Sequence, residues 1–186
     1  SMTHKSPSAP DRLLDAALHE FAEHGIGGAR THRIATSAAV NKQLIHYYFQ
    51  NKAGLYRAAL GHAAAGVASQ LAHLPLVGLT AVERLRRLVR GQFDFLFRHP
   101  DHTAMLVGAR DGGSWADVAL RPIVDLLSEG QATGFFRDDL DPENHARLGL
   151  LLTLGYFASR PLPDRWGPPE QWRDRAAELI VRGCSW

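Results

Sequence analysis

The chain of 186 residues contains a single cysteine, Cys184, and no apolar run that approaches the roughly 20 residues a membrane-spanning helix needs. One cysteine cannot form an intramolecular disulfide, and we interpret this one as a structural thiol. The first ten residues include a lysine but lack the apolar core of a signal peptide. Because 45% of the residues are hydrophobic and 22% are charged, the chain is typical of a globular protein, which we expect in the reducing cytoplasm and not at a membrane.

Acidic residues are missing from a long central stretch. No aspartate or glutamate occurs between Glu23 and Glu83, and no lysine follows Lys52. Residues 1–60 carry seven Lys or Arg against four acidic residues, whereas the rest of the chain carries 14 against 15. Alanine-rich helix packing explains the second half of the acid-free stretch but not the part from Arg30 to Arg57. That part predicts a surface that faces a polyanion such as nucleic acid.

Strand-like alternation and internal repeats are also absent. Apolar residues recur instead at spacings of three and four, which predicts an all-α fold of about nine helices. Thr31 and Asn51 are the expected N-caps of the second and fourth helices. The expected helices span about residues 11–24, 31–38, 41–49, 52–74, 81–98, 103–110, 115–129, 143–158 and 170–182.

Catalytic signatures are missing too, since the sequence has no G-x-S-x-G, P-loop or Rossmann glycine pattern. His99 and His102 have the spacing of paired metal ligands, but Pro100 interrupts a helix there and no third ligand is suitably spaced. We therefore expect neither an enzyme nor a metal site, and no cofactor.

The short helices expected at 31–38 and 41–49, joined by a tight break, are typical of a helix-turn-helix. On a helical wheel Ile45 and Phe49 fall on the side that faces the first two helices. The outward side consists of Gln43, His46 and Tyr47, flanked by Lys42 and Leu44. Glutamine can pair with adenine, lysine with guanine, and leucine can contact a thymine methyl, so this side suits a major groove. Tyrosine hydroxyls and the helix starts at Thr31 and Lys52 can meet phosphates.

The same region carries a recognisable pattern of anchors over about 50 residues. It comprises A-x-x-x-F-A-x-x-G (Ala17, Phe21, Ala22, Gly25), T-x-x-I-A (Thr31, Ile34, Ala35), Y-x-F-x-N-K (Tyr47, Phe49, Asn51, Lys52) and Leu55–Tyr56. The segment from Asp11 to Leu60 thereby resembles the DNA-binding domain of the TetR family of bacterial repressors. The resemblance implies a helix-turn-helix domain at 11–56 and a helical ligand-binding and dimerisation domain at 57–186.

The resemblance also implies roles for individual residues. The recognition helix would be 41–49, with base or backbone contacts from Lys42, Gln43, Leu44, His46 and Tyr47, and phosphate contacts from Thr31, Tyr48 and Lys52. The sequence departs from the pattern at two positions. Many members have a small hydroxyl residue where Leu44 stands and a tyrosine where His46 stands.

The second part of the chain contains the very apolar segment 149–157, GLLLTLGYF. In a single chain this segment would be core, and in a dimer it would form a four-helix interface with the final helix, as the resemblance favours. Large residues on the middle helices are candidates for a ligand cavity, although each one also fits a core position. The candidates are His62, Phe93, Phe97, Met105, Arg110, Trp115 and Tyr156.

Together these features predict a homodimeric transcriptional regulator that binds a palindromic double-stranded DNA operator. We expect a repressor that a small-molecule effector releases from DNA. An all-α enzyme or small-molecule carrier is the alternative from another class, and the acid-free basic stretch argues against it. An activator or an architectural DNA-binding protein would share the DNA contact.

Overall fold

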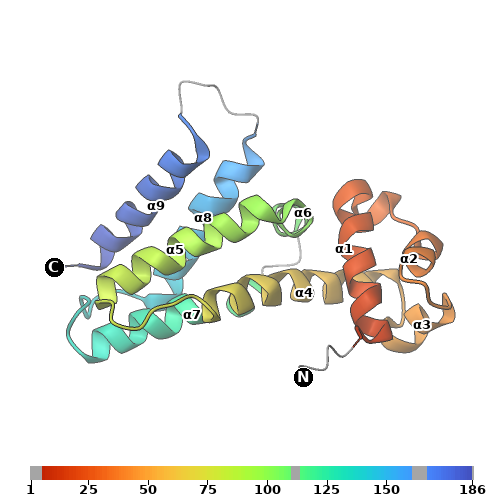
Figure 1. Ribbon diagram of the computed structural model, residues 1–186, viewed down its shortest axis with the longest axis horizontal. Helices are drawn as coiled ribbons and strands as arrows, with labels where there is room; N and C mark the ends of the chain where they lie inside the picture. Colours follow the sequence, from red (N-terminus) through yellow and green to blue (C-terminus); the bar gives the residue numbers. More distant parts are fainter. Residues whose placement is uncertain (1–5, 110–113, 161–166, 186) are drawn as a thin grey trace.

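The computed structural model describes residues 6–109, 114–160 and 167–185. Within these ranges the chain is all-α, as predicted, with nine helices and no strand (Figure 1). The helices are α1 (Ala9–Gly28), α2 (Thr31–Ser37), α3 (Gln43–Phe49), α4 (Lys52–Ala72), α5 (Ala81–Arg98), α6 (Pro100–Gly108), α7 (Ser114–Ala132), α8 (Pro142–Ala158) and α9 (Pro169–Cys184).

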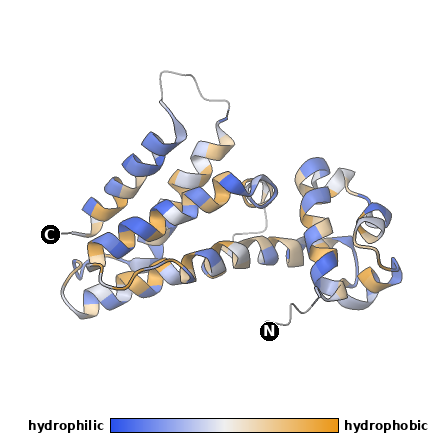
Figure 2. Cartoon of the chain, viewed as in Figure 1, coloured by the Kyte–Doolittle hydropathy of each residue, from blue (hydrophilic) through white to orange (hydrophobic). Residues whose placement is uncertain are grey.

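The helices form two groups that α4 connects. Figure 1 shows α1, α2 and α3 gathered at one end of the molecule and α5 to α9 towards the other. The long helix α4 packs against α1 and α3 and also against α5 and α7. Its buried residues recur every three or four positions, as at Leu60, Ala64, Val67 and Leu71, which lets one helix contribute to both groups. In Figure 2, α5 and α9 have separate hydrophilic and hydrophobic sides, as expected of helices that cover a core.

Local signals explain where several helices begin and end. Asn51 caps α4 as predicted, because its side chain accepts a hydrogen bond from the Gly54 N–H at 2.8 Å. The glycine predicted to end the first helix, Gly25, has φ +62° and ψ 175° and interrupts α1 there. A capping box formed by Thr80 and Glu83 starts α5.

Several boundaries differ from the prediction by a few residues, and three of these differences have a local explanation. The prediction that Thr31 caps α2 is wrong, because Arg30 occupies the cap position and Thr31 is the first helical residue. The third helix begins at Gln43 instead of residue 41, since the Asn41 side chain accepts the Gln43 N–H at 2.8 Å. The sixth begins at Pro100 instead of residue 103, because proline fits the first helical turn.

Two further features concern the described part of the chain as a whole. None of its helices has the length and apolar character that crossing a membrane requires. The thiol of Cys184 is fully buried, and burial raises its pKa to about 11. The thiol is therefore protonated and unreactive at neutral pH, as expected of a structural cysteine.

Gly130 is the position where α7 meets the connector to α8. Its carbonyl accepts hydrogen bonds from the N–H groups of Phe135 and Phe136, and the Phe136 ring is 1% exposed. A Cβ at residue 130 would overlap that ring. We expect Gly130→Ala to destabilise the protein by about 1–3 kcal/mol, because the buried ring must leave its site. Thermal or urea unfolding measures the change.

Gly61→Ala is the matched control. Gly61 lies within α4 and a Cβ there meets no atom within 4 Å. Alanine is a better helix former, so this variant should be more stable than wild type by up to about 1 kcal/mol. Equal stability changes for the two variants would contradict the packing explanation.

Candidate nucleic-acid interface and ligand pocket

Helix α1 holds both ends of α2. At the N-terminal end, the buried carboxylate of Glu20 accepts hydrogen bonds from the Arg30 N–H at 2.8 Å and from Arg33 Nε at 2.9 Å. At the other end, Arg12 Nε donates to the Ala38 carbonyl at 3.1 Å. These contacts satisfy terminal backbone groups that a seven-residue helix cannot satisfy itself. Glu20 and Arg12 therefore fix the orientation of α2, the first helix of the predicted helix-turn-helix.

The predicted recognition helix, α3, has one side against the core and one side exposed. Ile45 is buried, and Phe49 packs half-buried against the core cluster, as the helical wheel predicts. Leu44 is also half-buried against this cluster, so its predicted contact with a thymine methyl involves a residue that also anchors the helix. The exposed side chains of α3 and its cap are Lys42, Gln43, His46, Tyr47 and Tyr48.

Two of these exposed residues have a defined local chemistry. The His46 Nδ1 lies at hydrogen-bond distance from the Gln50 carbonyl, so in the neutral ring Nδ1 carries the hydrogen. The outward Nε2 is then an acceptor, which suits an amino group on a base edge. Tyr47 is 75% exposed, and it packs edge-on against Tyr48 with ring centroids 4.9 Å apart.

Some basic residues around α3 form contacts within the protein, and others have no ion-pair partner among the described residues. Besides the arginines that bind Glu20 and Ala38, Lys52 Nζ donates to the Ala29 carbonyl at 3.3 Å and ties α4 to the loop before α2. In the described part of the chain, the exposed side chains of Arg30 and Lys42 have no ion-pair partner. Sequence reasoning missed Arg30 as a candidate phosphate contact. Its place in the acid-free stretch was the available signal.

Three of the predicted ligand-binding residues come together. Phe93, which is 2% exposed, lies with its ring centroid 6.4 Å from that of Phe97 and 5.1 Å from that of Tyr156. Phe157, which sequence reasoning missed, joins them at 5.2 Å from Phe93. Beside this aromatic group lies a hollow of about 300 Å³, which we call the α5–α6–α8 hollow. Its walls include Leu96, Phe97, Thr103, Val107, Phe157 and Arg160.

The remaining predicted ligand residues lie elsewhere. His62 Nε2 is 2.9 Å from Asp15 Oδ1, so this histidine pairs with α1. Met105 lines a different hollow of about 550 Å³ between α1, α4 and α6. Trp115 is buried in the first turn of α7. Arg110 lies outside the described residues.

Helix α6 lies between the two groups of helices. It packs against α1, and its Asp101 Oδ2 is 3.0 Å from His19 Nδ1. The hydrogen bond and charge of Asp101 raise the pKa of His19. Ala104 of α6 lines both the α5–α6–α8 hollow and the hollow beside Met105. Helix α6 therefore lies between the α5–α6–α8 hollow, which is the candidate ligand site, and the helices that hold α3 in position.

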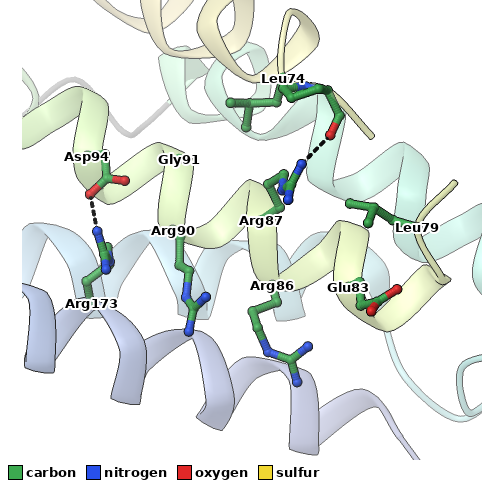
Figure 3. A pocket seen from close by; sticks show the side chains of 10 residues that line it. Leu74, Leu79, Glu83, Arg86, Arg87, Arg90, Gly91, Asp94 and Arg173 are labelled. Atoms are coloured by element: carbon green, nitrogen blue, oxygen red, sulfur yellow. Dashed lines mark hydrogen bonds and ion pairs between the residues drawn. The ribbon is translucent and has the colours of Figure 1, made fainter. Parts of the chain in front are cut away.

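A third hollow, of about 470 Å³, lies between α5 and α9 and is rich in arginine (Figure 3). Arg173 Nη1 is 3.0 Å from Asp94, Arg90 pairs with Asp174 at 3.1 Å, and Arg86 pairs with Glu178. Arg87 donates to the Pro75 carbonyl at 2.6 Å. Three of these four arginines pair with a carboxylate of the protein, and Arg87 is hydrogen-bonded to a neutral carbonyl. We therefore interpret these arginines mainly as links between α5 and α9.

Comparison with known proteins agrees with the arrangement at the α3 end. Residues 13–59 match the profile of "Bacterial regulatory proteins, tetR family". The chain is 33% identical over 161 residues to the HTH-type transcriptional repressor NicS of Pseudomonas putida, covering 79% of this chain and 74% of that protein. It is 48% identical over 60 residues to the HTH-type transcriptional repressor SCO4008 of Streptomyces coelicolor, covering 32% of this chain and 31% of that protein.

Solved structures show the same fold over nearly the whole chain. The fatty acid degradation regulator FadR from Bacillus halodurans superposes with a TM-score of 0.78 at 20% identity, covering 95% of this chain and 96% of that one. FadR from Bacillus subtilis, solved in complex with stearoyl-CoA, gives 0.74 at 18% identity, covering 92% and 97%. At these identities the likeness establishes the fold alone.

The ion pair between Glu20 and Arg33 predicts how the stability of the protein depends on pH. The Arg33 hydrogen bond is the main reason that the pKa of Glu20 lies below its usual value. A carboxylate with a lowered folded-state pKa stabilises the protein above its unfolded pKa, and this contribution is lost as pH falls through the folded value. Glu20→Gln should therefore cost about 1–3 kcal/mol at pH 7, and its difference from wild type should shrink towards pH 3. Urea unfolding at a series of pH values measures this.

Glu23→Gln serves as the control on the same helix. Glu23 is exposed and faces only histidines, at 3.6 Å from His19 and from His24. Its replacement should change stability by no more than about 0.5 kcal/mol. A pH-independent difference between Glu20→Gln and wild type would show that the carboxylate charge is not what stabilises α2.

Proposed function

Since this chain belongs to the tetR family of bacterial regulatory proteins, we propose that it is a transcriptional repressor that a small-molecule effector releases from its DNA operator. The exposed side of α3 is the observation that carries the proposal. It presents Gln43, His46 and Tyr47 within the acid-free stretch of the sequence, on a helix that the buried Ile45 anchors. Repressors among the relatives support the direction of regulation. The protein would act in the cytoplasm, where bacterial DNA lies.

The proposal divides the chain into a DNA-binding domain at 11–56 and an effector-binding and dimerisation domain at 57–186. In the first domain, Gln43, Leu44, His46 and Tyr47 would face bases in a major groove. Phosphate contacts would come from Arg30 and Lys42, and from Thr31, Tyr48 and Lys52. A lysine has three donors, so Lys52 can hold the Ala29 carbonyl and a phosphate together.

A second copy of the chain is the proposed partner of α8 and α9. Leu148 and Leu151 of α8 are 55% and 57% exposed, and Leu179 of α9 is 60% exposed. Leu148 and Leu151 lie on the same side of α8 as Gly155, and Leu179 lies on the same side of α9 as Arg175. We call these two exposed sides the leucine stripes. Exposed leucines in such stripes favour an isologous four-helix interface. A dimer would set the spacing of two α3 helices for a palindromic operator.

Helix α6 would transmit the effector signal. It contacts α1 through Asp101 on one side and borders the α5–α6–α8 hollow through Thr103 and Val107. An effector that binds better to one position of α6 would shift α1 and, with it, the separation of the two α3 helices. Operator affinity would fall only as far as the effector discriminates between the two arrangements.

The proposed roles of Lys42 and Gln43 can be separated by experiment. Lys42→Ala should weaken binding to operator and random DNA alike and reduce the slope of log affinity against log salt by about 1. Gln43→Ala should relax the preference at one base position by about 1–3 kcal/mol and leave the slope unchanged. Fluorescence anisotropy with DNA from upstream of the chain's own gene, at several salt concentrations, measures both quantities.

Arg98→Ala is the charge-matched control. Arg98 is exposed in the last turn of α5 and lies outside the helix-turn-helix. Its replacement removes one positive charge and should change neither slope nor base preference. Equal losses on operator and random DNA for Gln43→Ala would contradict base reading by Gln43, and absence of any sequence-dependent binding by wild type would contradict the proposed function.

The dimer proposal predicts the effect of a charge in the leucine stripe. Leu151→Glu should convert the protein to monomers, because two copies would bury unpaired carboxylates face to face. Operator affinity should then fall at least tenfold, since one α3 helix contacts one half-site. Analytical ultracentrifugation and anisotropy measure these changes.

Val77→Glu is the control, because it places the same charge at a 99% exposed apolar residue outside the stripe. It should change neither the oligomeric state nor the operator affinity. A dimeric Leu151→Glu protein would refute this interface.

A further inference from the structure

The α5–α6–α8 hollow has apolar walls and one charged side chain. Leu96 and Phe97 come from α5, Val107 from α6 and Phe157 from α8, and among the described residues that line the hollow only Arg160 has a formal charge. Its volume of about 300 Å³ is at the lower end of the range for small-molecule sites. Phe97 is 45% exposed and Val107 is 37% exposed, so apolar surface is open to solvent there.

The guanidinium of Arg160 lies against two aromatic rings. Its guanidinium carbon lies 5.6 Å from the centroid of the Tyr156 ring and 5.9 Å from that of Phe97. Such cation–π contacts orient a guanidinium without neutralising its charge. Among the described residues, no carboxylate pairs with Arg160. This contrasts with the arginines between α5 and α9, which pair with Asp94, Asp174 and Glu178.

We propose that the effector is a small monocarboxylate whose apolar body fills the α5–α6–α8 hollow and whose carboxylate binds Arg160. The inference rests on the proposed function, because it names the chemical class of that effector. A planar guanidinium presents parallel N–H donors that match the two oxygens of a carboxylate. One cation matches a single negative charge, whereas a phosphate dianion would leave a charge unbalanced beside apolar walls.

The position of the hollow links such a ligand to the helices that hold α3. Four of its lining residues, Pro100, Thr103, Ala104 and Val107, belong to α6, which also contacts α1. Thr103 Oγ1 also donates to the Leu96 carbonyl at 2.6 Å, which links α6 to α5 at the wall of the hollow. A ligand between these helices would bias their separation.

The test compares acids with neutral molecules of the same shape. The full-length protein is titrated with benzoate and hexanoate, and in parallel with benzamide and hexanamide, while thermal unfolding and operator binding are recorded. At least one acid should raise the Tm and release the operator, and its amide should do neither. In Arg160→Gln the apparent affinity for that acid should fall at least tenfold, and Arg160→Lys should retain part of it.

A variant with the opposite charge and a matched control variant test the role of Arg160 further. Arg160→Glu should no longer bind the acids and should bind benzylamine instead, because the charge at this position is inverted. Arg147→Gln removes an exposed arginine from α8, the helix that ends just before Arg160. Arg147 pairs with Asp117 at 3.1 Å, and its variant should respond to acids like wild type.

The outcomes separate this inference from the proposed function. If wild type binds a specific operator but no acid acts more strongly than its amide, or if Arg160→Gln responds to the acid like wild type, the carboxylate site is refuted and the regulator proposal stands. If wild type binds no DNA specifically, the regulator proposal fails, whatever the acids do to the Tm.

Discussion

The buried carboxylate of Glu20 is the contact on which the geometry of the DNA-facing end depends. It joins α1 to the first turn of α2 through the Arg30 backbone and the Arg33 side chain. Helix α3, of seven residues, is too short to be stable by itself, so its position comes from packing against α4 and from the burial of Ile45 in the shared core. Glu20 is buried and its charge is paired with Arg33, so it adds little negative potential to the exposed side of α3.

Helix α1 also determines how firmly this end is connected to the rest of the molecule. It forms an ion pair with α4 through Asp15 and His62, and one with α6 through His19 and Asp101. The side chains on α1, Asp15 and His19, are both more than 60% exposed. Exposed pairs of this kind contribute little stability, so they orient the helices more than they fix them. A junction held mainly by apolar packing can adopt a second arrangement at small cost. That property is what release by an effector requires.

The sequence predicts the number of helices and their approximate limits, because apolar spacing, Asn51, Gly25 and the prolines are local signals. It also predicts that Ile45 is buried and that Gln43 and Tyr47 are exposed, since one helical wheel decides those positions. It does not predict that Lys52 binds the Ala29 carbonyl or that His62 pairs with Asp15, because both contacts join residues 23 and 47 positions apart. The pocket is harder still, since Phe97, Val107, Phe157 and Arg160 meet only when three helices are packed.

The buried polar side chain of Glu20 in α1 has hydrogen-bond partners, whereas that of Gln92 in α5 has none among the described residues. Gln92 of α5 is fully buried, and neither polar atom of its side chain has a hydrogen-bond partner in the described part of the protein. An unpaired buried amide costs about 1–3 kcal/mol, which a leucine at this position, one turn from both Leu88 and Leu96, would avoid. Glu20 at the other end has every partner it needs. The cost therefore falls on α5, which also borders the α5–α6–α8 hollow, and not on α1, whose contacts orient α2. A locally less stable core lowers the free energy that a change of conformation there requires.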